Sequence, residues 1–431
     1  MHVAVLGAGV IGVTSAWYLA QAGHEVTLID RHAQPGEETS SANGGQISVS
    51  HAAPWANPRV PRKILRWLGR EDAPLLFRLR ADPAQWAWGL RFLRECTPSR
   101  TRRNIRQLVT LGVYSRASLR TLRAETGITY DELTRGILHF YTSEREYADA
   151  HDSAKIMGEY GCDIEMVSAK RCVEIEPALE GVALVGGSYS PGDESGDAHK
   201  FTQELARLAL KRGVRFRRGR IQALLAERDR ISGLRLENEL LRADAYLVCL
   251  GSYSPLLVQA LGIRLAIYPL KGYSVTLPVA DARKAYSVSL TDDEHKLVFS
   301  RLGERLRIAG TAELSGYNTE LNEARCHAIL RRALALFPGA AEPSRAQFWA
   351  GLRPATPNNI PYIGATRYPN LYLNTGHGTL GWTHACGSGR AIAEIVSGRR
   401  PEIDFAFTGL PSDRPRTGER AAATGARLRL P

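Results

Sequence analysis

The sequence predicts a mixed α/β protein, in which a parallel sheet is combined with a second, mostly antiparallel sheet. Three observations predict this fold: a strand, glycine turn, helix and strand at the N-terminus, a second glycine turn near the C-terminus, and period-2 apolar stretches between them. Since the two glycine turns lie at opposite ends of the chain, the nucleotide-binding domain must be discontinuous. We expect it to comprise residues 1–50, 195–262 and 355–405, and the second domain to comprise 51–194 and 263–354.

The composition excludes several classes of protein. The chain has 431 residues, of which 44% are hydrophobic and 23% charged, and this excludes a disordered or collagen-like protein. No apolar run approaches the roughly 18 residues of a membrane-spanning helix. The six cysteines lie too far apart to form a CxxC motif, so no metal site is expected. Scattered thiols and an N-terminus without a secretory leader favour a cytoplasmic protein.

The first nucleotide-binding unit follows the apolar residues 3–6. GAGVIG (residues 7–12) leads into a helical pattern, and a second apolar stretch ends at Asp30. The first glycine permits a tight turn, the second lets the backbone approach a pyrophosphate, and the third lets the helix pack against the strand. Asp30 is placed to bind a ribose hydroxyl, whereas Arg31 could instead meet a 2′-phosphate, so this unit alone leaves FAD and NAD(P) open. The predicted contacts are Val3, Gly7, Ala8, Gly9, Val10, Ile11, Gly12, Asp30 and Arg31.

A second glycine-rich segment lies near the C-terminus. The apolar strand 371–374 runs into TGHGTLGWT (residues 375–383), which is followed by a helical pattern of small residues to about residue 396. A helix N-terminus in this position would stabilise negative charge on the pyrimidine edge of a reduced flavin. The segment 39–46 adds small residues, hydroxyls and backbone donors, which suit a phosphate and a flat ring. Both segments favour a flavin.

The most specific motifs are FWAGLRPATP (348–357) and NTGHGTLGWTHACGSGR (374–390); others are ETSSANGGQIS (38–48), GDESGD (192–197) and YPLKGYSVTLP (268–278). Together they resemble the FAD-dependent D-amino-acid oxidase and glycine oxidase superfamily, and most closely its bacterial D-amino-acid dehydrogenases, the small flavoprotein subunit. The resemblance implies a Rossmann-like FAD-binding domain, a substrate domain, and oxidative deamination of D-amino acids to 2-oxo acids and ammonia. In that reaction a hydride passes from Cα to flavin N5, and a quinone or another non-oxygen acceptor takes the electrons.

The resemblance also extends the set of cofactor residues. Covalent-flavin variants of the family carry a reactive Cys or His at particular flavin-side positions. None is present in residues 39–46 or 353–359, so we expect FAD to be non-covalent. The added contacts are Ser40, Ser41, Ala42, Asn43, Gly44, Gln46, Ile221, Gly251, Gly376, Gly378, Thr379 and Leu380.

Four residues are candidates for substrate binding. Arg353, in the motif AGLRP, is the first choice for anchoring a carboxylate through two parallel charge-assisted hydrogen bonds. Tyr273 could add a hydroxyl at the carboxylate or amine, or only pack within its strand. His377 could act as a base or shape the glycine turn. His51 stands where the related dehydrogenases carry a tyrosine, and is either a polar substrate contact or an exposed loop residue. None is assigned as certainly catalytic.

Two alternative functions stay open on the sequence. A glycine- or sarcosine-type enzyme, or another secondary-amine oxidase or dehydrogenase acting on D-proline or hydroxyproline, has the same fold. The departures from the family at Ser50-His51 and Asn358 leave the exact amino acid open. An RNA-associated flavoprotein would also be basic, and the formal net charge is +12. However, no RNP, KH or zinc module is present, so no nucleic acid partner is expected.

A basic, tryptophan-rich insert is predicted at about residues 55–106. It contains Trp55, Trp67, Trp86 and Trp88, with short amphipathic stretches at 63–68 and 86–93. Cationic and aromatic faces suit contact with an anionic membrane surface, here the cytoplasmic face of the inner membrane. The alternative is a solvated helical face whose tryptophans pack inward. The final residues, 410–431, are rich in Pro, Ala, Gly and Arg and predict a disordered tail.

The remaining elements follow from periodicity and glycine positions. An amphipathic helix is expected from 201 to 212, ended by Gly213, and a hairpin turn at 302–305. Strands are expected at 136–142, 214–217, 245–251, 265–277, 286–290, 296–301 and 306–312.

Overall fold

A six-stranded sheet forms one side of the molecule in the computed structural model, which describes residues 1–61, 64 and 75–410. The strand order is β19–β20–β13–β1–β2–β9; all neighbours are parallel except β19, which is antiparallel to β20. Its central strands are fully buried, as is usual for a parallel sheet covered on both faces. The bounds are β1 (His2–Leu6), β2 (Glu25–Asp30), β9 (Arg215–Arg218), β13 (Ala245–Val248), β19 (Tyr362–Ala365) and β20 (Leu371–Thr375).

Four helices pack together on one face of this sheet. Helix α10 lies against both α1 and α4, and α1 also contacts α7. The approach is close because α10 carries glycines: a Cβ at Gly387 would lie 2.7 Å from Ser115 Cα, and one at Gly389 would lie 2.9 Å from the Thr14 carbonyl carbon. The bounds are α1 (Val10–Gln21), α4 (Pro98–Thr126), α7 (Ala198–Lys211) and α10 (Gly381–Val396).

The second, larger sheet is mostly antiparallel. Its order is β18–β14–β17–β16–β15–β5–β7–β6, with β4 added beside β17; the pairs β15–β5 and β17–β4 are parallel. Helices α9 (Glu323–Leu336), α5 (Glu144–Gly158) and α6 (Ala169–Ile175) contact this sheet. The strands are β4 (Leu75–Phe77), β5 (Ile137–Tyr141), β6 (Glu165–Ser168), β7 (Gly186–Ser190), β14 (Tyr268–Pro278), β15 (Ser289–Asp292), β16 (Leu297–Leu302), β17 (Arg305–Leu314) and β18 (Gln347–Ala355).

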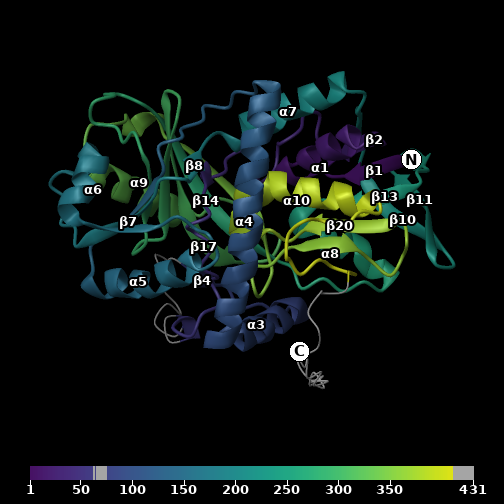
Figure 1. The fold of residues 1–431 in the computed structure, drawn as a ribbon, viewed down its shortest axis with the longest axis horizontal. Coiled ribbons are helices and arrows are strands. Elements are labelled where there is room, and N and C mark those ends of the chain that lie inside the picture. Colours follow the sequence, from purple (N-terminus) through teal and green to yellow (C-terminus); the bar gives the residue numbers. More distant parts are fainter. Residues whose placement is uncertain (62–63, 65–74, 411–431) are drawn as a thin grey trace, which may run out of the picture.

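Two smaller sheets complete the fold of the described residues. The pair β3 (Gln46–Ile47) and β8 (Glu194–Ser195) lies at the junction of the two main sheets, and β10–β11–β12 form a separate small sheet. In Figure 1 the parallel sheet lies on the right and the larger sheet on the left, while α4 runs between them over the full height of the view. The other bounds are α3 (Pro83–Glu95), α8 (Ser254–Val258), β10 (Ile221–Glu227), β11 (Arg230–Leu236) and β12 (Leu240–Leu241).

The predicted fold class is confirmed, with differences at several element boundaries. Helix α7 begins three residues earlier than predicted, because the Asp197 side chain accepts hydrogen bonds from the backbone of His199 and Lys200. The 29-residue helix α4 was not predicted. It begins inside the segment assigned to the basic insert and continues about 20 residues beyond the predicted end of that insert, as far as Thr126. The helix α4 begins with Pro98 in its first turn and ends at Gly127, which adopts the left-handed conformation.

Some predictions are not tested by this structure. The domain limits stay predictions, and most of the amphipathic stretch at 63–68, with Trp67, lies outside the described residues, as does the tail from residue 411. Within the described part of the chain, no helix is long and apolar enough to cross a bilayer. Over the same residues, no three His, Cys, Asp or Glu side chains gather in a metal-binding arrangement.

Candidate functional site

Two adjoining cavities occupy the junction between the sheets. The first, about 390 Å³, lies at the carboxyl ends of β1, β2, β13 and β20, where open α/β sheets bind ligands. The second, about 700 Å³, lies between the segment after β3, helix α5 and the larger sheet. Five residues line both cavities, so the cavities share a wall: Asn43, Gly44, Ala309, Arg353 and Thr379.

The first glycine turn has no room for a side chain at Gly12. Gly7 has a φ of +104°, and a Cβ at Gly12 would lie 1.8 Å from the Gly7 carbonyl oxygen. Helix α1 can therefore approach the turn only without a side chain at this position. Gly9 is the N-cap of α1 and brings no side-chain cap, and Ser40 Oγ accepts a hydrogen bond from the Val10 backbone at 3.0 Å.

Asp30 and Arg31 have different surroundings at the end of β2. Asp30 is oriented by the backbone N–H groups of Ala8 and His32, at 2.7 and 2.9 Å, and lines the first cavity. Arg31 forms an ion pair with Glu38, and its guanidinium lies 4.7 Å from the centre of the Tyr253 ring. Because Glu38 already supplies the counter-charge of Arg31, the local geometry favours a free ribose hydroxyl over a 2′-phosphate.

Most of the predicted cofactor residues line the first cavity. Gln46 and Leu380 line only the second cavity, and the Gln46 side chain is held by Ser289, Leu290 and Thr291. Val3, Ala8, Gly12 and Ser41 line neither cavity. Those lining the first cavity are Gly7, Gly9, Val10, Ile11, Asp30, Arg31, Ser40, Ala42, Asn43, Gly44, Ile221, Gly251, Gly376, Gly378 and Thr379.

Several wall residues were missed. Glu38, Thr39 and Trp349 stand within motifs quoted above and Cys249 within the predicted strand 245–251, but their types gave no separate signal. Two buried polar atoms of this wall have no hydrogen-bond partner in the described residues: Asn374 Oδ1 and His377 Nε2. These features fit FAD. The unsatisfied polar atoms suit the flavin ring, the open N-terminus of α1 suits the phosphates, and the oriented carboxylate of Asp30 suits a ribose hydroxyl.

Arg353 is a half-buried cation that has no acidic partner among the described residues. Its guanidinium donates to the Thr311 carbonyl at 2.7 Å, with a longer contact of 3.5 Å to the Gly310 carbonyl. Among the described residues no carboxylate oxygen lies within 4.0 Å of it. Burial, together with the charge of Arg325, lowers the pKa of Arg353 to about 10, so it stays a cation at neutral pH. A half-buried charge without a counter-charge, in the wall of two cavities, favours an anionic ligand.

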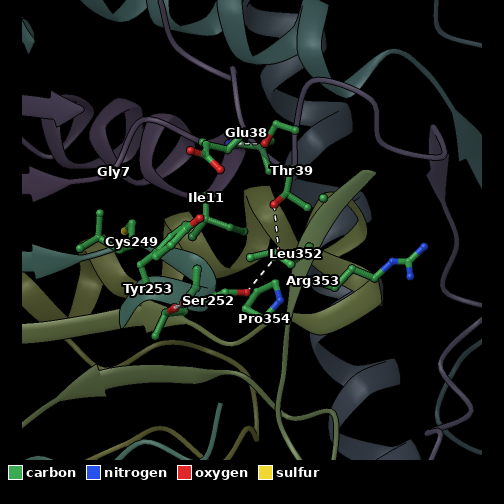
Figure 2. A pocket seen from close by; sticks show the side chains of 18 of the residues that line it. Gly7, Ile11, Glu38, Thr39, Cys249, Ser252, Tyr253, Leu352, Arg353 and Pro354 are labelled. Carbon is green, nitrogen blue, oxygen red and sulfur yellow. Dashed lines mark hydrogen bonds between the residues drawn. The ribbon is translucent and has the colours of Figure 1, made fainter. Parts of the chain in front are cut away.

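The strand β18 presents Arg353 in a fixed place. The Leu352 carbonyl accepts hydrogen bonds from Thr39 Oγ1 and Ser252 Oγ, both at 3.1 Å. Figure 2 shows this carbonyl between the two side chains, with the Arg353 side chain pointing away from them. The guanidinium passes over Gly272 of β14, where a Cβ would lie 2.2 Å from Arg353 Cζ. The position of the charge thus depends on the backbone of three strands.

Tyr273 lies in the wall of the first cavity, but its hydroxyl has a partner of its own. The side chain is 1% exposed, and the hydroxyl donates to Glu313 Oε2 at 2.5 Å. Burial opposes ionisation of Glu313, yet Tyr273, Lys271 and Arg78 hold the pKa of that carboxyl below its usual value. This geometry favours a structural role for the hydroxyl over the predicted contact with substrate.

Tyr273→Phe should therefore affect stability more than turnover. We expect kcat/KM to change by less than about fivefold, and the free energy of unfolding to fall by about 1.5–3 kcal/mol, because a charged buried acceptor loses one donor. Steady-state kinetics and thermal unfolding of the FAD-loaded protein measure the two effects. A hundredfold fall in kcat/KM at unchanged stability would instead assign the hydroxyl to substrate.

The two predicted histidines lie in different cavities. His377 is 2% exposed in the first cavity, and burial, with His384 beside it, holds the pKa of His377 well below its usual range. It is therefore neutral at physiological pH. His51 lines the second cavity, where its ring stacks on His139. The structure brings His51 and Arg353 into one cavity and places His377 and Tyr273 with Arg353 in the other.

The fold and the first cavity together are those of a flavin-dependent oxidoreductase. The profile of the family described as FAD dependent oxidoreductase matches residues 2–395, and the chain belongs to this family. It is an FAD-dependent oxidoreductase.

Individual relatives agree over nearly the whole chain. It is 59% identical to the D-amino acid dehydrogenase of Dechloromonas aromatica, over 94% of this chain and 99% of the relative. It is 56% identical to the protein of the same name from Paramagnetospirillum magneticum, over 95% and 98%. Among solved structures, the fold is similar to glycine oxidase from Geobacillus kaustophilus, with a TM-score of 0.73, 22% identity, and 93% and 96% of the two chains covered. The L-proline dehydrogenase from P. horikoshii has the same TM-score, with 17% identity and 93% and 94% coverage.

Proposed function

We propose that this protein oxidises the Cα–N bond of a D-amino acid, giving an imino acid that water converts to the 2-oxo acid and ammonia. The observation that carries this proposal is the half-buried guanidinium of Arg353, which lies in the wall shared by the two cavities and has no acidic partner among the described residues. A substrate carboxylate supplies the missing counter-charge. The names of the relatives at 59% and 56% identity support D-amino acids as the substrate class.

In this reaction, different residues bind the substrate and the cofactor. Arg353 binds the carboxylate and so fixes one end of the substrate at the boundary between the cavities. Gly9, Val10 and Ile11 hold the cofactor phosphates at the start of α1, and Asp30 holds a ribose hydroxyl. FAD supplies the acceptor for the hydrogen that leaves Cα with its electron pair. Burial keeps His377 neutral beside this region, so it donates or accepts a hydrogen bond without adding charge.

Anaerobic reduction of the flavin tests the proposal directly. The purified FAD-loaded protein is mixed with D- and L-amino acids, glycine, sarcosine and D-proline, and the loss of flavin absorbance is followed. We expect D-amino acids to bleach the flavin and a quinone analogue to restore its colour faster than oxygen. Bleaching only by glycine, sarcosine or D-proline would move the protein to a secondary-amine or glycine enzyme. Bleaching by none of them would refute the proposal.

We further propose that a quinone accepts the electrons at a membrane surface, and that helix α3 makes the contact. The helix buries Gln85, Trp88, Phe92 and Glu95, and its opposite face exposes Trp86 (53%), Leu90 (64%) and Leu93 (48%). Arg91 and Arg94 are exposed beside this apolar face. An aromatic and aliphatic stripe flanked by arginines suits the interface of an anionic bilayer.

Introducing charge on this face should weaken membrane attachment. For the double variant Trp86→Asp/Leu93→Asp we expect binding to phosphatidylglycerol-containing vesicles to fall at least about tenfold. Each substitution removes apolar area from the contact and adds a carboxylate that the anionic lipid repels. Turnover with a water-soluble acceptor should be unchanged. Leu210→Asp on α7 is a matched control, because Leu210 is also 48% exposed. Equal vesicle binding by all three proteins in a sedimentation assay would exclude α3 as the contact.

A further inference from the structure

A cluster of titratable side chains in the second cavity is left unexplained by the binding of a carboxylate and FAD. His139 on β5 contacts Asp293 through Nδ1, at 2.7 Å from Asp293 Oδ2, and Asp293 Oδ1 lies 3.0 Å from Lys296 Nζ. The other ring nitrogen of His139 lies 3.3 Å from Ser50 Oγ. Both ring nitrogens of His139 are therefore occupied, and the ring is held from two sides.

His51 differs from His139 because its nitrogens are unoccupied. Its ring stacks on His139 with a centroid distance of 5.6 Å and an interplanar angle of 30°. Across the described residues, neither nitrogen of His51 has a hydrogen-bond partner, although the residue lines the second cavity. The clamped His139 ring thus fixes the plane of a second imidazole whose polar atoms are open to whatever enters the cavity.

The charges around His51 decide its state. Burial, with the neighbouring charges of His139, Lys296 and Arg353, lowers the pKa of His51 to about 4, while Asp293 acts in the opposite direction. The imidazole is therefore neutral at physiological pH and carries one nitrogen that accepts a hydrogen bond. Although burial opposes ionisation of Asp293, Lys296 and His139 hold the pKa of that carboxyl well below its usual range, so it remains an anion behind the two rings.

We propose that His51 binds the α-amino group of the substrate, at the opposite end from the carboxylate held by Arg353. This assignment rests on the proposed amino acid substrate and extends it. His51 accepts a hydrogen bond from the ammonium or amine, and the anionic Asp293 adds an attractive field for a positive group. His139, Ser50 and Asp293 are positioning residues, because Ser50 and Asp293 hold the His139 ring and the His51 ring stacks on it.

The two anchors together restrict the substrate more than either alone. A carboxylate bound only to Arg353 can rotate about its bond to Cα, which moves the Cα hydrogen away from a fixed acceptor. A second hydrogen bond through the amino group stops this rotation and leaves the side chain and the hydrogen as the two remaining substituents of Cα. Since Arg353 and His51 lie on different elements around the same cavity, the pair can also distinguish the two enantiomers.

Removal of the amino-group contact should be visible as a difference between two ligands. The probes are D-alanine and propionate, which share a carbon skeleton and differ only in the amino group. In the FAD-loaded protein, propionate binding is measured by the change in flavin absorbance. D-Alanine is measured by the concentration that gives half the maximal rate of anaerobic flavin reduction. The variants are His51→Phe, which keeps a ring against His139, and His51→Gln, which restores an acceptor.

We expect His51→Phe to raise the half-saturating D-alanine concentration about 10- to 100-fold and to change the propionate dissociation constant by less than about threefold. His51→Gln should recover part of the loss. Asp293→Asn should produce a smaller shift in the same direction, again without affecting propionate. Equal weakening of both ligands in His51→Phe, or no change in either, would overturn the assignment to His51. Failure of the unmodified protein to be reduced by D-alanine or any other D-amino acid, with propionate still bound, would instead overturn the proposed function and this assignment together.

Discussion

Replacing Arg353 with methionine should lower kcat/KM for D-amino acids by about 10³-fold, equivalent to roughly 4 kcal/mol of transition-state binding, while FAD stays bound. The reason is that Arg353 is, among the described residues, the one cation that lines both cavities, and it has no acidic partner there. Arg353→Lys keeps the charge but loses the planar pair of donors, so an intermediate loss is expected. Steady-state kinetics and the flavin spectrum of the purified variants measure both effects.

The stability of the Arg353→Met protein gives an independent check. Among the described residues the guanidinium donates to the carbonyls of Thr311 and Gly310 and to no carboxylate, so its removal leaves no carboxylate without a partner. An unpaired charge is costly to bury even in part, and we therefore expect the melting temperature without substrate to be equal or higher. Arg283→Met is the control, because Arg283 is exposed and pairs with Asp281. Retention of activity in Arg353→Met, or a large loss of stability, would contradict the role of Arg353 as a ligand-binding cation.

Gly12→Ala should abolish FAD binding, with an expected loss of at least about 100-fold in affinity. The added Cβ would lie 1.8 Å from the oxygen and 2.9 Å from the carbon of the Gly7 carbonyl, and both atoms belong to the backbone. No side-chain rotation can relieve this contact, so the start of α1 must move away from the turn that we propose to hold the phosphates.

The matched control for this variant is Gly158→Ala at the end of α5. Gly158 has an ordinary backbone conformation, and a Cβ there would meet nothing within 4 Å. Flavin absorbance at fixed protein concentration, followed by titration of the apoprotein with FAD, compares the two variants. A Gly12→Ala protein that purifies with a full complement of FAD would show that the turn tolerates the displacement and that its geometry does not govern cofactor binding.

Features encoded by neighbouring residues could be predicted from the sequence. The turn at residues 7–12, Asp30 and the turn at 376–378 depend on backbone conformations and spacings within a few residues, and they lie in the wall of the first cavity. Helix α4 was missed although it has local signals. Its buried residues, such as Leu108, Leu119 and Leu122, are separated by many arginines. The composition of the segment is therefore that of a charged insert, and this obscures the helical periodicity.

Features that depend on distant residues could not be predicted. The hydroxyl of Tyr273 is taken by Glu313, which lies on the neighbouring strand, and only the pairing of β14 with β17 brings the two together. Arg31 and Glu38 are only seven positions apart, but the loop between them has no periodicity that would predict their ion pair. His139 and Asp293 are 154 positions apart and meet because β5 and β15 are parallel neighbours. Pattern and propensity carry no information about such pairs.

The order of strands in the parallel sheet has a consequence for how the protein is made. β1 is synthesised before the other strands of this sheet, yet it lies between β2 and β13, and β13 is synthesised some 240 residues later. β20 and its glycine turn come later still. The nascent chain therefore carries an unpaired apolar strand edge during most of its synthesis, and the FAD site is complete only near the end. A cofactor that binds only the finished sheet stabilises it by mass action, which makes flavin supply a determinant of how much folded protein accumulates in the cell.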